Sequence, residues 1–243
     1  MKTTTRIVAR VGVGVALALG LVAGGAALWA HRPWRPAVLV NGRALTVGEL
    51  DLRARTLLDD ARRTAAPSNA AAFTEAAALP YYRRQAAKMW IVKETLLAAA
   101  LARGVTATPA DEKASLAQIA ARLKSRGLTP EQFFREGPLP EDVKRRDFRE
   151  GVLIDAFIAR EVRDKIDVPA AAVDARLDAL RRTAGDKTPT RRQALAALRA
   201  ERFREGFRRL CAELFQKTTL ACPAYPDLED FDELYLNNKK TKD

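Results

Sequence analysis

Three Thr-Pro pairs mark the starts of helices along this chain, at residues 108–109, 129–130 and 188–189. A threonine hydroxyl can accept a hydrogen bond from the first turn of a helix, and proline loses no hydrogen bond at the first helical position. Between and after these starts, apolar residues recur at spacings of three and four. The pattern predicts a mainly α-helical protein.

The expected helices follow one another with short connections. One begins after Thr46, which is spaced to form a capping box with Glu49, and a second runs from about Pro80 to Gly104, a C-cap glycine. Residues 64–79 and 184–187 are expected to be loops. Further helices are expected over residues 108–127, 129–136, 140–165, 168–183 and 188–214.

Two short strands complete the predicted fold. Residues 38–45 alternate around Asn41-Gly42, which is the strongest local signal for a β-hairpin. Residues 218–222 form a second candidate strand, which Pro223 ends. Because these strands lie near opposite ends of the helical region, we expect them to pair and close the fold.

The N-terminal residues carry a long apolar run. Residues 11–30 contain no charged side chain and follow Lys2, Arg6 and Arg10. The run is long enough to span a bilayer, and its basic flank places the N-terminus inside. We therefore expect residues 1–36 to form a single-pass anchor that leaves the rest on the periplasmic face of the inner membrane. The alternative is a cleaved signal segment and a soluble periplasmic protein.

Charge and cysteine content add less. The net charge of +12 suits nucleic acid, an anionic membrane or acidic clients, although an ordinary solvated surface rich in arginine explains it better, and the expected export argues against nucleic acid. Cys211 and Cys222 could pair in an oxidising compartment or remain two separate buried thiols. Residues 224–243 are acidic and then rich in lysine. We expect this tail to be disordered, although it could also fold back onto the body or dock a partner.

The order of these elements resembles the SurA/PrsA/PpiD family of chaperones. Residues 40–58 (VNGRALTVGELDLRARTLL) look like the family's opening strand and helix. Residues 111–134 resemble its paired helices, which end in aromatic residues, and residues 142–169 look like its long helix and Ile-x-Val-Pro exit. Residues 191–222 resemble the helix and strand that return to complete the N-terminal domain.

This resemblance implies a multi-helix SurA-type chaperone domain over residues 37–223, built from residues 37–169 and 188–223. Family members usually carry one or more parvulin isomerase domains between these two parts, whereas here only residues 170–188 lie there. Parvulin sites use buried histidines, and the single histidine of this chain is His31, next to the apolar run. We therefore expect no isomerase activity, no other enzymatic activity, no metal and no cofactor.

The resemblance implies a holdase that binds unfolded or exported polypeptides. One alternative is an adaptor that uses the same fold to assemble one partner complex, and another is a scaffold subunit that pairs with an active isomerase in trans. Aromatic and methionine side chains suit the loose recognition of many sequences, although any one of them could simply be part of the core. The candidate client-binding residues are Tyr81, Tyr82, Met89, Trp90, Phe133 and Phe134.

Overall fold

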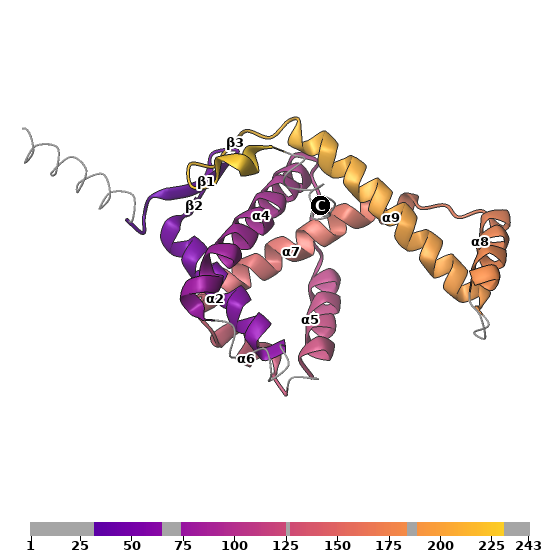
Figure 1. Cartoon of the computed structure of the whole chain (residues 1–243), viewed down its shortest axis with the longest axis horizontal. Helices are drawn as coiled ribbons and strands as arrows, with labels where there is room; N and C mark the ends of the chain where they lie inside the picture. The colour runs from indigo at the N-terminus through magenta and orange to yellow at the C-terminus, as the bar shows by residue number, and fades with distance from the viewer. Residues whose placement is uncertain (1–31, 65–73, 125–126, 184–188, 231–243) are drawn as a thin grey trace, which may run out of the picture.

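The computed structural model describes residues 32–64, 74–124, 127–183 and 189–230 (Figure 1). It opens with a β-hairpin of β1 (Pro36–Val40) and β2 (Arg43–Thr46). Asn41 and Gly42 form the turn with φ angles of 49° and 81°. These left-handed values suit the right-handed twist of a hairpin, which is why the Asn-Gly pair predicted the turn correctly.

The third strand, β3 (Leu220–Ala221), pairs antiparallel with β1. Leu39 lies opposite Ala221 and Val40 opposite Leu220, so the strand order is β2-β1-β3. The predicted pairing between an N-terminal and a C-terminal strand is therefore confirmed. The sheet joins the first and last parts of the described chain.

Most of the rest of the described chain is helical, which confirms the mainly α class with a small sheet. The α-helices are α2 (Val47–Thr64), α4 (Glu75–Ala102), α5 (Pro109–Lys124), α6 (Pro130–Arg135), α7 (Glu141–Glu161), α8 (Ala170–Thr183) and α9 (Arg191–Phe215). Two short 3-10 turns, η1 (Arg163–Lys165) and η2 (Pro226–Glu229), follow α7 and β3.

Two helices begin elsewhere than predicted. Helix α4 starts at Glu75 and contains Pro80, because the extra turn buries Leu79 in the core beneath the sheet. Helix α9 starts after Thr190, whose hydroxyl accepts a hydrogen bond from the N–H of Gln193 at 3.3 Å. The side-chain oxygen of Gln193 accepts a hydrogen bond from the N–H of Thr190 at 2.8 Å, so a complete capping box fixes this boundary. The expected start at residue 188 lies outside the described residues.

Buried apolar side chains of the described residues form three clusters. The first lies under the sheet and contains Val38, Leu45 and Ile91. The second lies where α4, α7 and α9 meet, with Phe157 fully buried. Here α9 approaches the end of α7 closely, because a Cβ on Gly206 would lie 2.9 Å from Cγ1 of Val162.

The third cluster is small and lies apart from the other two. Val173 and Leu177 of α8 pack on Ala194 of α9. Figure 1 shows α8 and this half of α9 projecting from the rest of the molecule. We call residues 170–183 and 191–198 the arm, and we call the sheet with α2, α4, α5, α6 and α7 the body.

No helix in the described ranges is long and apolar enough to cross a membrane. Even α4, the longest, carries Arg83, Lys88 and Glu94 along its length, whereas a span needs about 20 predominantly apolar residues. The sequence predicted a single-pass protein on the periplasmic face of a membrane. This finding contradicts that predicted localisation. The segment expected to form the span, residues 11–30, lies outside the described residues.

The first residues of the predicted tail pack against the body, and the two cysteines remain apart. Residues 224–230 are ordered against the body, because Leu228 is fully buried in the first cluster and Asp227 forms an ion pair with Arg84. Glu229 accepts a hydrogen bond from the N–H of Cys222 at 2.6 Å. Cys211 and Cys222 are separate buried thiols, not a disulfide. The rest of the predicted tail, residues 231–243, lies outside the described residues.

Candidate functional site

Two adjoining cavities open between the helices of the body. One has a volume of about 320 Å³ and the other about 370 Å³, and Thr56, Leu139 and Asp147 line both. Together they form what we call the groove, with walls from α2, α4, α5, α6 and α7. Cavities of this size accommodate side chains or small ligands.

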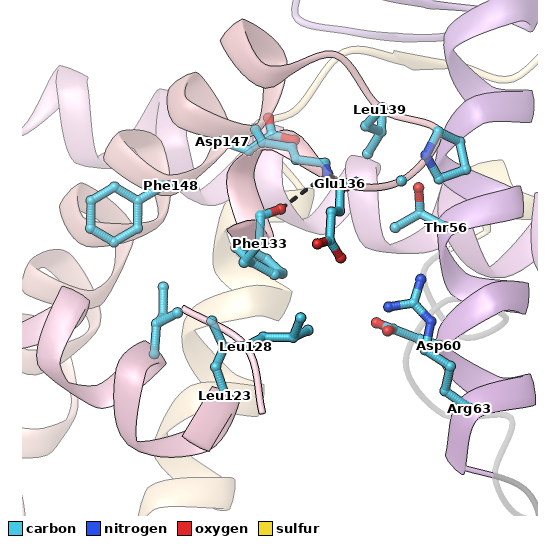
Figure 2. Close-up of a pocket in the computed structure, with 14 residues that line it drawn as sticks. Thr56, Asp60, Arg63, Leu123, Leu128, Phe133, Glu136, Leu139, Asp147 and Phe148 are labelled. Carbon is cyan, nitrogen blue, oxygen red and sulfur yellow. Dashed lines mark hydrogen bonds between the residues drawn. The ribbon is translucent and has the colours of Figure 1, made fainter. Parts of the chain in front are cut away.

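Helix α2 supplies one wall of the groove. Thr56, Leu57, Asp60 and Arg63 lie on one side of this helix, because Asp60 follows Thr56 by four residues and Leu57 by three, and Arg63 follows Asp60 by three. In Figure 2, Asp60 and Arg63 lie across the cavity from Leu123 and Leu128. An apolar wall therefore faces a wall that ends in charged groups.

The aromatic side of the groove is held in place by rings in edge-on contact. The Phe134 ring is buried and makes edge-on contacts with Phe133 at 5.5 Å and with Phe148 of α7 at 5.7 Å between centroids. The Arg145 guanidinium lies 4.7 Å from the Phe134 ring centroid. Phe134 thus anchors α6 to α7, and Phe133 beside it remains 38% exposed at the cavity.

Lys144 fixes the end of α6. Its ammonium donates a hydrogen bond to the carbonyl of Phe133 at 3.1 Å, drawn in Figure 2, and another to the carbonyl of Glu136. A cation in this position satisfies carbonyl groups that a helix leaves unpaired at its C-terminus. Partial burial of the ammonium lowers the pKa of Lys144, although nearby Glu136 opposes that shift.

The floor of the groove is polar but internally neutralised. Asp147 accepts hydrogen bonds from Arg53 at 2.7 Å and from Lys93 at 2.6 Å. Burial alone would raise the pKa of Asp147, but these two hydrogen bonds outweigh it and hold the pKa below its ordinary value. The carboxylate therefore stays ionised and paired, which makes it a poor general base.

The ionic contacts continue behind the floor. Lys93 also pairs with Glu150, and Arg43 of β2 bridges Glu150 at 3.2 Å and Glu94 at 2.7 Å. Glu94 is only 2% exposed, and burial raises its pKa despite the neighbouring cations. We call Arg43, Arg53, Lys93, Glu94, Asp147 and Glu150 the ion network.

The lining offers contact surface more than reactive groups. Among the described residues that line the two cavities, there is no histidine, cysteine or serine. Nowhere in the described part of the chain do three or more His, Cys, Asp and Glu side chains lie close enough together to hold a metal ion. The arrangement can bind apolar groups and orient charged ones beside them.

The predicted client-binding residues divide between the groove and the core. Phe133, Met89 and Trp90 line the groove, with Met89 59% exposed and Trp90 buried. Phe134 is buried behind the wall, where it supports Phe133.

The two tyrosines belong elsewhere on the protein. Tyr82 packs on the first cluster, and the exposed Tyr81 contacts it edge-on at 5.2 Å between centroids. Neither tyrosine lines the two cavities of the groove. The structure therefore brings three of the six candidates together at one site.

Sequence reasoning missed several groove residues. Thr56 and Leu139 line both cavities, while Leu123 and Phe148 line the first. The helical spacing on α2 could have indicated Thr56. Leu123, Leu139 and Phe148 come from elements far from α2 in the sequence, so no local pattern connects them with it.

Comparison with known proteins adds no assignment. No family model matches the chain, and neither the curated proteins nor the solved structures contain a match to it.

Proposed function

We propose that this protein is a holdase of the SurA type, which binds unfolded polypeptides in the groove and has no isomerase activity. The observation that carries the proposal is the groove itself, with Met89 and Phe133 exposed at its rims. Exposed apolar surface of this kind usually marks a binding site. Methionine and aromatic side chains tolerate many partners because they give contact area without demanding one geometry.

The charged groups of the groove fit the same role. Asp60, Arg63 and Lys144 lie at the cavity beside the apolar wall, so a bound segment would place its side chains on the wall and its polar backbone toward these groups. The proposed lack of isomerase activity rests on the sequence, which has one histidine where parvulin-like sites use several.

Light scattering tests the proposal directly. Two or three unrelated, chemically unfolded proteins are diluted into buffer with and without the whole chain, and their aggregation is followed. The expected result is suppression of aggregation for all of them at near-stoichiometric ratios. Failure with every one of them would contradict a general holdase and favour the partner-specific adaptor.

A variant links the activity to the groove. A double variant in which both Met89 and Phe133 are replaced by serine should suppress aggregation less well. Both side chains are exposed, and their loss removes apolar contact area. The matched control is Leu101→Ser, since Leu101 is 60% exposed on α4 but does not line the groove. Equal activity of the two variants would show that the groove is not the binding site.

A further inference from the structure

A second cavity system lies at the base of the arm, away from the groove. It has a volume of about 670 Å³ and is lined by Arg163, Ile166, Arg199, Ala200, Phe203 and Arg204. We call it the basic pocket. Its walls are the turn η1, which follows α7, and one face of α9.

The charge of the basic pocket is unbalanced. Among the described residues, its lining holds three guanidinium groups and no carboxylate. All three arginines are exposed, and none forms an ion pair with a described residue. Arg204 donates one hydrogen bond to the carbonyl of Ala200 at 3.2 Å, which uses one of its five donors.

The neighbouring cavity shows that this imbalance is particular to the basic pocket. That cavity, of about 550 Å³, shares Ile166 with the basic pocket but has four basic and four acidic residues in its lining. Its basic residues are Arg103, Lys165, Arg202 and Arg209, and its acidic residues are Glu161, Asp167, Glu205 and Glu213. One cavity is neutral overall and the other is strongly positive, although both contact α9.

The floor of the basic pocket is apolar. Phe203 is half-buried and stacks on Phe207 at 5.9 Å between ring centroids, with the ring planes 9° apart. Ile166 is also half-buried. A ligand there would meet an apolar surface at the centre and guanidinium groups around it.

We infer that the basic pocket binds an acidic polypeptide segment that carries an apolar side chain among its carboxylates. Arginine donors match the geometry of a carboxylate, with two parallel hydrogen bonds to each group. Phe203 and Ile166 give the apolar side chain a surface on which to pack. A nucleic acid fits less well, because Glu201 and Glu205 interrupt the arginines along α9 and would repel a continuous run of phosphates.

The experiment measures fluorescence anisotropy of a short labelled peptide in which Glu and Asp alternate with Leu, mixed with the whole chain at low salt. The expected result is saturable binding that weakens as salt is added. Replacing Leu by Ser in the peptide should also weaken binding, because the apolar contact is lost. Absence of binding at low salt would overturn the inference.

Two charge-reversal variants locate the site. Arg199→Glu combined with Arg204→Glu should weaken peptide binding at least about tenfold, because charge-assisted hydrogen bonds become repulsions. Arg181→Glu combined with Arg182→Glu is the control, with the same change in net charge on α8, outside the basic pocket. An equal loss in both variants would show that only net charge matters and would overturn the site.

Other anions separate the classes of partner. A single-stranded oligonucleotide and vesicles of anionic phospholipid are tested with the same variants. If the oligonucleotide or the vesicles bind, and lose binding when Arg199 and Arg204 are reversed, while the peptide does not bind, the assignment of a polypeptide ligand is wrong. Because Arg199 and Arg204 lie outside the groove, their charge reversal should leave the suppression of aggregation unchanged. The peptide assay therefore tests this inference, and the aggregation assay tests the holdase proposal independently.

Discussion

The body and the arm are stabilised by different amounts of tertiary structure. In the body, a sheet closes the fold, two large apolar clusters fill the interior, and the ion network ties β2 and α2 to α4 and α7. In the arm, one small cluster holds α8 against α9. The proposed binding groove thus lies in the body, which has the more extensive tertiary contacts. The basic pocket lies where the arm joins the body.

This difference indicates that the arm can unfold locally while the body stays folded. Proteins unfold locally where few apolar side chains are buried, so hydrogen exchange should be faster in the arm than in α4 or α7. Mutations that act on one region and spare the other test this difference.

The largest effect is expected in the second cluster. Phe157→Ala removes a fully buried ring where α4, α7 and α9 meet, and should lower the free energy of unfolding by about 3–5 kcal/mol. Urea unfolding followed by circular dichroism measures the change. The body should lose stability as one cooperative unit, and a loss below 1 kcal/mol would contradict the placement of Phe157.

Leu177→Ala should have a smaller and local effect. Leu177 is nearly buried in the third cluster, and its truncation should destabilise the packing of α8 by about 2 kcal/mol. Hydrogen exchange read by mass spectrometry should show faster exchange over residues 170–183 and 191–198, with α4 and α7 unchanged. If α4 and α7 exchange faster as well, the arm and the body unfold together and the comparison fails.

Lys93→Met tests the ion network of the body. The substitution keeps most of the side-chain volume but leaves Asp147 without its 2.6 Å partner and removes one of the two cations that pair with Glu150, the other being Arg43. Breaking a buried pair costs about 3–5 kcal/mol, and these groups keep some exposure, so a loss of about 2 kcal/mol is expected. Lys88→Met, on the same helix but outside the network, is the control for urea unfolding.

The same network makes stability depend on pH. The pKa values of Asp147 and Glu150 are below their ordinary values in the folded protein, because hydrogen bonds from Arg53, Lys93 and Arg43 outweigh the effect of burial. Their contribution to stability is present above the unfolded pKa values, about 4, and is lost as the pH falls through the lower folded values. Glu94 has the opposite shift, so its protonation in acid relieves a cost.

The measurement is the urea midpoint between pH 7 and pH 3 for the natural chain and for Asp147→Asn. The natural chain should lose stability as the pH falls below 4, because the unfolded chain binds protons that Asp147 and Glu150 resist. Asp147→Asn should be less stable at pH 7 and should show a shallower fall. Parallel curves for the two proteins would contradict the role of Asp147.

The sequence predicted the fold better than the site. The Asn41-Gly42 turn and Thr129-Pro130 helix start depend on a few adjacent residues, so local chemistry determines them and both were predicted correctly. The start of α4 was missed because burial of Leu79 favours helix before Pro80, and burial is a tertiary effect.

The six candidate residues show why the site was harder to predict. They form three adjacent pairs, and in each pair the first residue is exposed while the second is more buried. Neighbours on a helix point about 100° apart, so one member of a pair can be exposed while the other packs in the core. Sequence alone identified the aromatic and methionine positions, but the choice within each pair depends on which helix packs alongside. The pairs are Tyr81-Tyr82, Met89-Trp90 and Phe133-Phe134.

The smallest predicted effects come from two matched helix caps, one in each region. Thr129 begins α6 at the groove, and Thr190 begins α9 in the arm, both with a complete capping box. Replacing either with alanine removes one capping hydrogen bond and should lower stability by about 1 kcal/mol. Thr190→Ala should speed hydrogen exchange in the arm alone, whereas Thr129→Ala should loosen α6 and weaken suppression of aggregation by displacing Phe133. Reduced suppression by Thr190→Ala alone would mean that clients depend on the arm and not on the groove.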